Sequence, residues 1–174
     1  MTTDEVLKEL GRPRRCRTDD LPIGGGKEFP SSPDELINPL TVRHGLTEAR
    51  ARHLADAYGT RAEDLLAFCA GRTDDHPLHP NSPITGGEIA WLIRHEHVVH
   101  LVDIVMRRTS LAITGQVNTT LIDRIAMVAA AELGWSPERT HSERWGLIAE
   151  LRDYHNVTPE MLEKRAEEGK KSCA

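Results

Sequence analysis

The sequence is short of aromatic residues, of cysteines and of long apolar runs, and each shortage excludes a class of protein. Aromatic residues make up 4% of the chain and no stretch alternates convincingly between apolar and polar residues, which argues against a β-rich fold. The three cysteines, Cys16, Cys69 and Cys173, lie far apart, so we expect free thiols in a reducing compartment and no disulfide framework. No apolar run approaches the roughly 18 residues of a membrane-spanning helix.

An excess of positive charge is also absent. Lysine and arginine number 22 against 27 aspartates and glutamates, a formal net charge of -5, whereas a nucleic-acid-binding protein needs a dense cationic surface. The first residues, Met1–Glu5, are acidic where a signal peptide would be basic and then apolar. At 174 residues the chain has the length of one globular domain, and we expect a cytoplasmic protein.

Helix-start signals are frequent along the chain. A capping box places Ser or Thr first and Glu three residues later, so that two free backbone N–H groups find acceptors. The boxes are Thr2–Glu5, Ser32–Glu35, Thr60–Glu63 and Thr85–Glu88. Two further starts, Ser136-Pro137 and Thr158-Pro159, and two C-terminal glycines, Gly59 and Gly134, complete the pattern.

These signals predict an all-α fold, a compact multi-helix bundle with an irregular arm rich in proline and glycine. The predicted helices are 3–10, 33–43, 47–58, 61–70, 86–108, 118–133, 137–155 and 159–168. Pairing of two flanking segments could add a short ribbon.

We divide the chain into an N-terminal helix with an extended arm, residues 1–31, and a helical domain, residues 32–174. The arm contains Leu21–Gly26, a Pro/Gly-rich stretch without helical periodicity. A second irregular segment, Gly71–Pro83, holds several prolines that each fix one backbone torsion, which predicts a stiff, extended loop. We expect the histidines of this loop, including His79, to be exposed to solvent.

The predicted helix 86–108 carries charges on an apolar face. By helical spacing, the side chains of one group lie within about 60° of one another among apolar neighbours; the group is Glu96, His100, Asp103 and Arg107. Buried charge is costly unless it is paired, so we expect a structural ion network that fixes the register of the helix. A functional site is one alternative, because titratable groups in apolar surroundings often mark chemistry, and partial exposure of these charges to solvent is the other.

Several motifs come close to a known chemistry without reaching it. A zinc protease helix needs two histidines four residues apart, but Val99 stands four residues after His95. A metal-dependent enzyme that uses Glu96, His97 and His100 stays open as a weaker alternative, although no further ligand is evident. The run Gly24–Gly26 fits neither a dinucleotide fingerprint nor a Walker loop. We therefore assign no catalytic, cofactor-binding or metal-ligating residue in this chain.

A set of short segments in a fixed order resembles one known family. The segments are Tyr58–Ala62, Pro77–Pro80, Ile84–Ile89, Arg94-His95-Glu96, Asp103 and Arg107–Ala112. Together they resemble the C-terminal helical domain of FAD-dependent glycerol-3-phosphate dehydrogenases and the related alpha-glycerophosphate oxidases. The likeness covers residues 40–153 and the arm from Cys16 to Gly25, and its most specific part is the pair of motifs Arg94-His95-Glu96 and Arg107-Arg108-Thr109.

The resemblance implies that catalysis and helical packing belong to different regions of the enzyme. In that family a larger N-terminal region binds FAD and oxidises glycerol 3-phosphate to dihydroxyacetone phosphate, and the electrons pass to quinone or oxygen. This chain has no such region, so the resemblance implies an accessory domain of glycerol metabolism that is inactive alone and binds no FAD itself. Its two motifs are then scaffold features, not catalytic groups.

The expected partner is a separate FAD-binding dehydrogenase half, which would hold the chain in the cytoplasm or at the periphery of the inner membrane. An independent helical module that binds a partner or dimerises through helices bearing Trp91, Trp135 and Trp145 is the alternative. Tryptophan more often fills helix junctions in a core, so we expect these three side chains to be core anchors.

Overall fold

Helices make up most of the protein, as the sequence predicts, and the computed structural model describes residues 3–12, 21, 23–80 and 82–171. In chain order the elements are α1 (Thr3–Glu9), α2 (Asp34–His44), α3 (Glu48–Tyr58), η1 (Gly59–Arg61), α4 (Ala62–Cys69), β1 (Pro77–His79), β2 (Ser82–Thr85), α5 (Gly86–His95), η2 (Asp103–Arg108), α6 (Thr119–Leu133), α7 (Pro137–His155) and α8 (Pro159–Lys171). The strands β1 and β2 form a short antiparallel ribbon that pairs Pro77 with Thr85 and His79 with Ser82. The all-α prediction is confirmed, and the ribbon is the small addition that the sequence left open.

The predicted caps account for the ends of several helices. Thr85 and Ser136 each accept a hydrogen bond from the backbone N–H three residues later, at the starts of α5 and α7. Thr158 accepts from the N–H of Met161 in the same way. Gly134 ends α6 in the left-handed conformation, with φ of 65°. The four caps are therefore confirmed.

Two of the predicted capping boxes do not form. The start of α4 has no side-chain cap, because Thr60 lies inside η1 and Arg61 stands at the N-cap position. The Thr60 hydroxyl donates instead to the carbonyl of Lys27 in the arm. At the start of α2 the N–H of Glu35 bonds to the backbone carbonyl of Ser32 at 3.1 Å, not to its hydroxyl. The predicted box at Thr2, like the thiols of Cys16 and Cys173, lies outside the described residues.

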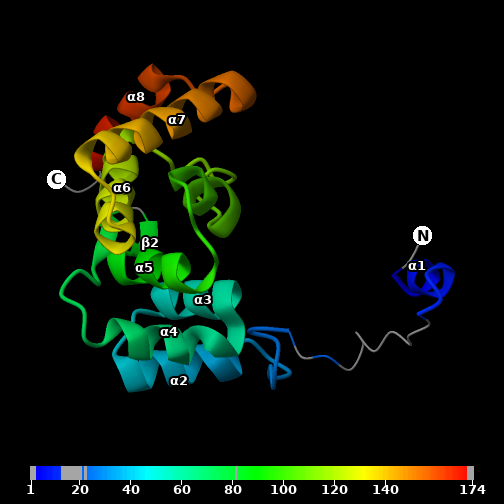
Figure 1. Ribbon diagram of the computed structural model, residues 1–174. Coiled ribbons are helices and arrows are strands. Elements are labelled where there is room, and N and C mark those ends of the chain that lie inside the picture. Colours follow the sequence, from blue (N-terminus) through cyan, green and yellow to red (C-terminus); the bar gives the residue numbers. More distant parts are fainter. Residues whose placement is uncertain (1–2, 13–20, 22, 81, 172–174) are drawn as a thin grey trace.

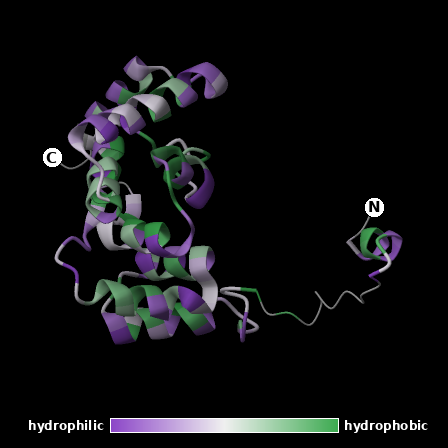
Figure 2. Cartoon of the chain, in the orientation of Figure 1, coloured by the Kyte–Doolittle hydropathy of each residue, from purple (hydrophilic) through white to green (hydrophobic). Residues whose placement is uncertain are grey.

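Two hydrophobic clusters meet at α5. The smaller cluster joins buried side chains of α2, α3 and α4 and includes Trp91 of α5. The larger cluster runs from the ribbon through α6 to α7 and α8 and takes Ile89, Leu92 and Ile93 from α5. In Figure 1 the helices α2, α3 and α4 lie together at one end of the molecule, α7 and α8 at the other, and α5 between. Figure 2 shows that α5 is strongly hydrophobic, which follows from burial on both sides.

The prediction of one continuous helix over 86–108 is wrong. Helix α5 ends at His95, His97 takes a positive φ of 51°, and a new helical segment follows that includes the π-helix η2. The carboxylate of Asp103 accepts the N–H groups of Val99 and His100, at 3.1 and 2.9 Å, and so competes with continuation of the helix. The apolar periodicity hid this break, because Val98 and several later apolar residues are buried in the same cluster as the apolar face of α5.

The burial of one histidine and three tryptophans can be compared with the predictions. His79 is buried at 7% exposure within β1, so the prediction of a solvent-exposed loop histidine is wrong. Trp91 is a core residue as expected and Trp135 packs partly buried against the larger cluster, whereas Trp145 on α7 is 51% exposed. Helix α1 buries none of its residues.

Two glycines allow the effect of backbone conformation on stability to be measured without steric clashes. An added Cβ atom would have no atom within 4 Å at either Gly134 or Gly146, apart from its own local backbone. Gly134 has a positive φ of 65°, and we expect Gly134→Ala to lower the free energy of unfolding by about 1 kcal/mol. Gly146 lies inside α7, and we expect Gly146→Ala to raise that free energy by about 0.5–1 kcal/mol. Urea unfolding of the two variants measures both changes, and changes of the same sign would contradict the account.

Candidate functional site

The most deeply buried charge that the structure describes is Glu88, in the first turn of α5. Its side chain is 1% exposed, and the hydroxyl of Thr85 accepts a hydrogen bond from its backbone N–H at 3.2 Å. An acidic residue at this position is favoured by the helix dipole, and the cap fixes the direction in which the chain enters α5. The carboxylate is therefore held at the junction of α3, β2 and α5.

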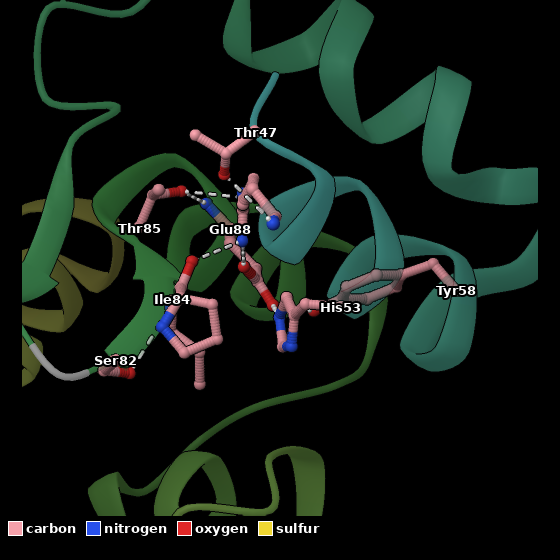
Figure 3. Close-up of polar contacts among 9 residues, drawn as sticks. Thr47, His53, Tyr58, Ser82, Ile84, Thr85 and Glu88 are labelled. Carbon is pink, nitrogen blue, oxygen red and sulfur yellow. Dashed lines mark hydrogen bonds and ion pairs between the residues drawn. The ribbon is translucent and has the colours of Figure 1, made fainter. Parts of the chain in front are cut away.

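All three side chains that bind the Glu88 carboxylate come from α3. Arg50 forms an ion pair with it, His53 lies 2.7 Å from Oε1 through its Nε2, and the Tyr58 hydroxyl donates to Oε1 at 2.8 Å. Figure 3 shows His53 and Tyr58 reaching Glu88 from the α3 side. The two helices are thus joined through one carboxylate.

Arg50 extends this cluster to the ribbon. Besides Glu88, its guanidinium donates to the carbonyl of Pro83 at 2.6 Å and to the hydroxyl of Thr85 at 3.2 Å. Its side chain is 13% exposed, so the positive charge is nearly as enclosed as the carboxylate. We call Arg50, His53, Tyr58, Thr85 and Glu88 the Glu88 cluster.

The electrostatics of the Glu88 cluster favour fixed charges. Burial by itself would raise the pKa of Glu88, but the hydrogen bonds and charges of His53 and Arg50 lower it below the usual value, so the carboxylate stays ionised. Burial, helped by the Glu88 charge, raises the pKa of Tyr58, which keeps its hydroxyl as a donor. The lowered pKa of Glu88 and the raised pKa of Tyr58 keep both groups in one protonation state near neutral pH, which suits a structural junction.

A cleft opens beside the Glu88 cluster. It has a volume of about 540 Å³ and lies between the end of α3 and the segment from η2 to Ile113. His53, Tyr58 and Glu88 line one side. The other side is lined by Arg107, Arg108, Thr109, Ser110 and Ile113. The π-helical form of η2 is of interest here, because short π segments often occur at functional sites.

The four residues predicted to form one ion network do not meet as a group. Asp103 and Arg107 form an ion pair within one helical turn, but Glu96 lies near Arg61 and Arg108, at 3.7 and 3.6 Å. His100 instead bonds to Glu143 of α7 at 2.9 Å. The break in the helix is the physical reason, because Glu96 and His100 lie within it and do not share a helical face with Asp103 and Arg107. Three separate groups of pairs, around Glu96, His100 and Asp103, correct the expectation of a single network.

The family motifs hold neighbouring elements together. Arg94 bonds to Glu132 of α6 at 2.7 Å, and the ring of His95 stacks on Trp91 with 3.7 Å between the centroids. Arg108 faces Glu96 at 3.6 Å, and the Thr109 hydroxyl donates to a backbone carbonyl within its own segment at 2.9 Å. These contacts link α5 to α6 and to η2.

The Glu88 cluster itself escaped the sequence analysis, although part of its signal was present. The box Thr85–Glu88 placed an acid at the start of a helix with apolar residues on every side, which indicates a buried carboxylate in need of a cation. Nothing in the spacing identified Arg50 or His53 as its partners, because they lie more than thirty residues earlier in the sequence.

In the glycine run of the arm, Gly25 packs against the backbone at the end of α3. A Cβ atom on Gly25 would lie 2.4 Å from the carbonyl oxygen of Tyr58, and one on Gly59 would lie 2.1 Å from the carbonyl oxygen of Gly25. The residues of the described ranges form one two-stranded ribbon and no βαβ unit, so Gly24–Gly26 does not fit a dinucleotide phosphate. The glycines instead permit close contact between the arm and the end of α3.

The described residues hold neither a group of metal ligands nor a membrane-spanning helix. Among them, no three side chains of His, Cys, Asp or Glu converge as ligands for a metal ion. None of the helices that the structure describes has the length and apolar character to cross a membrane.

The chain is similar to known proteins over most of its length. Residues 16–140 match a family model described as the C-terminal domain of alpha-glycerophosphate oxidase. The chain is 27% identical over 143 residues to a glycerol-3-phosphate dehydrogenase of Synechocystis sp., which covers 77% of this chain and 25% of the relative. It is 26% identical over 135 residues to an alpha-glycerophosphate oxidase of Lactococcus lactis, which covers 75% and 22%.

A mitochondrial relative also matches most of this chain and only a small part of its own length. The mitochondrial glycerol-3-phosphate dehydrogenase of Rattus norvegicus is 31% identical over 133 residues, which cover 73% of this chain and 18% of the relative. The matched part of the chain thus spans a quarter or less of the length of these relatives.

Replacement of Glu88 by glutamine tests the structural role of the cluster. Glu88→Gln keeps the size of the side chain but leaves the enclosed charge of Arg50 without its counter-ion. We expect the free energy of unfolding at pH 7 to fall by about 3–5 kcal/mol, as measured by urea titration.

The matched control is Glu63→Gln. Glu63 pairs with Arg43 and His44, but its side chain is 44% exposed, so we expect a loss of about 1 kcal/mol or less. Equal losses in the two variants would show that the Glu88 carboxylate has no special part in stability.

Proposed function

Because the chain belongs to the family of C-terminal domains of alpha-glycerophosphate oxidase, we propose that it acts as the accessory helical domain of a FAD-dependent glycerol-3-phosphate dehydrogenase. The substrate of that enzyme is glycerol 3-phosphate, its product is dihydroxyacetone phosphate, and its electrons pass to quinone. The observation that carries the proposal is the match of residues 16–140 to a domain and not to the whole enzyme.

The chemistry belongs to the flavin-bearing half of the enzyme. Hydride transfer from glycerol 3-phosphate needs the flavin, and in the glycine run of the arm Gly25 lies against the backbone of Tyr58. The carboxylate and the tyrosine of the Glu88 cluster are held in fixed protonation states by their partners. We therefore propose that this chain alone does not oxidise glycerol 3-phosphate.

The residues of the family motifs serve as scaffold in this proposal. Arg94 and Arg72 both bind Glu132, whose side chain is 7% exposed, and so tie α5 and the loop after α4 to α6. The helical domain, residues 32–174, is then the packing unit, and the arm within residues 1–31 connects it to the flavin-bearing half. We place the assembly in the cytoplasm, with any contact to the inner membrane made by that half.

Self-association is a second candidate, and one observation favours it. Trp145 is 51% exposed on α7, with the ring of His141 at 6.1 Å beside it, although tryptophan is usually enclosed. Sedimentation of the purified chain over a range of concentrations separates the two functions, because only a dimerisation module sediments faster as the concentration rises.

Reconstitution tests the proposed function. The flavin-bearing part of the Synechocystis dehydrogenase, without its C-terminal domain, is co-expressed with this chain, with its own C-terminal domain as a separate chain, or with neither. We expect this chain to co-purify with the flavin-bearing part and to raise dye reduction by glycerol 3-phosphate at least tenfold over that part alone. The chain by itself, with free FAD, is expected to give no turnover.

Two results would contradict the proposal. One is turnover by the isolated chain with free FAD. The other is a flavin-bearing part that assembles with its own C-terminal domain but not with this chain, which would show that the family likeness does not extend to docking.

A further inference from the structure

The arm is fixed to the body of the protein. The N–H of Thr60 donates to the carbonyl of Gly25 at 3.0 Å, and the Thr60 hydroxyl donates to the carbonyl of Lys27 at 2.9 Å. The close backbone contact between Gly25 and Gly59 leaves no space for a side chain at either position. These contacts restrict the conformations of the chain around Gly25 and Lys27, at a cost in conformational entropy. The side chains of this part of the arm are therefore presented in one arrangement.

This fixed arm exposes large apolar side chains. Ile23 is 77% exposed and Phe29 is 45% exposed, on either side of the Gly25 contact. Ile113, at the edge of the cleft beside the Glu88 cluster, is 89% exposed. Apolar side chains that an ordered loop holds in water are typical of a surface that another protein covers.

The arm and the cleft belong to one face. Asp56, Ala57 and Tyr58 at the end of α3 line the cleft on one side and, on the other, a second hollow of about 390 Å³ beneath the arm. In Figure 1 the arm and the segment around η2 lie on the same side of the molecule. We call this surface, from Ile23 and Phe29 across the end of α3 to Ile113, the arm face.

Cationic side chains border the arm face. Arg107 and Arg108 line the cleft, and their side chains are 66% and 41% exposed. Each has an acidic neighbour within the chain, Asp103 and Glu96, so their charges are partly balanced. A partner that carries apolar side chains at its centre and acidic ones at its edge fits this surface.

The position of the family match indicates which partner covers the arm face. The match to a C-terminal domain begins at residue 16, within the arm, and 75% of the Synechocystis relative lies outside its similarity to this chain. In a polypeptide of that kind the flavin-bearing region precedes residue 16 and meets the helical domain through the arm. The arm face is therefore the surface next to the point where the two halves join.

We infer that the arm face is the docking surface for the flavin-bearing half of a glycerol-3-phosphate dehydrogenase, with Ile23 and Ile113 as its most exposed apolar side chains. This inference rests on the proposed function and specifies where the contact is made. A few large side chains that become buried supply most of the binding energy of an interface, so the loss of Ile23 and Ile113 should weaken docking far more than the loss of an equally exposed residue elsewhere.

The experiment measures the affinity of the full-length chain for the flavin-bearing part of the Synechocystis dehydrogenase by titration calorimetry. The test variant carries Ile23→Ser and Ile113→Ser, and the control carries Val42→Ser, a residue of α2 that is 83% exposed. We expect the dissociation constant to rise at least tenfold for the test variant and less than twofold for the control. Thermal unfolding of both variants should match the wild type, because the replaced side chains are exposed.

The outcomes separate the inference from the function on which it rests. Wild-type affinity in the test variant would overturn the arm face but leave the proposed function standing. Equal loss in the control would also overturn it, because binding would then depend on exposed apolar residues in general. Absence of binding by the wild-type chain would overturn both, and self-association that the test variant abolishes would assign the face to a second copy of the chain.

Discussion

The ion pair between Glu88 and Arg50 is the interaction on which the arrangement of the helices depends. It lies where α3, the ribbon and α5 meet, and both charges are almost fully enclosed. An enclosed charge without a partner costs several kcal/mol, so neither helix can move away from the other without that penalty. His53 and Tyr58 complete the hydrogen bonds of the carboxylate and add two further links from the same helix.

The same junction connects the two hydrophobic clusters to the outer surface. Helix α5 contributes Trp91 to one cluster and Ile89 to the other, so a fixed α5 fixes both. The end of α3 then carries Gly59 and Thr60, which hold the arm through backbone contacts. A shift of α3 would thus displace the part of the arm around Gly25. In the proposed function, this chain of contacts holds the docking surface in one shape.

The sequence predicted local structure well and long-range pairing poorly, for identifiable reasons. Thr85, Ser136 and Gly134 act within one helical turn of their own position, so their effects can be read from neighbouring residues. Thr60 has the same local pattern but does not cap α4. It lies inside η1, and its hydroxyl donates to the carbonyl of Lys27, more than thirty residues earlier in the sequence.

The break inside the segment 86–108 and the partners of Glu88 show the same limit. The apolar spacing continues past His95 because the segments before and after the break pack in the same hydrophobic cluster. The break itself is stabilised by the carboxylate of Asp103, which accepts the backbone N–H of His100. Glu88 was visible as an acid in an apolar helix, but only folding brings it to Arg50. The family motifs were recognisable as a pattern, and their role as links between helices became evident from the structure alone.

Native-state hydrogen exchange tests the central claim, that the Glu88 cluster makes α3, the arm contact and α5 one cooperative unit. The amides of residues 51–60 should lose protection together with those of α5, with the same opening free energy and the same dependence on urea. Exchange of the α3 amides and the Thr60 amide through a separate, lower-energy opening, with α5 still protected, would show that the buried ion pair does not hold these elements together.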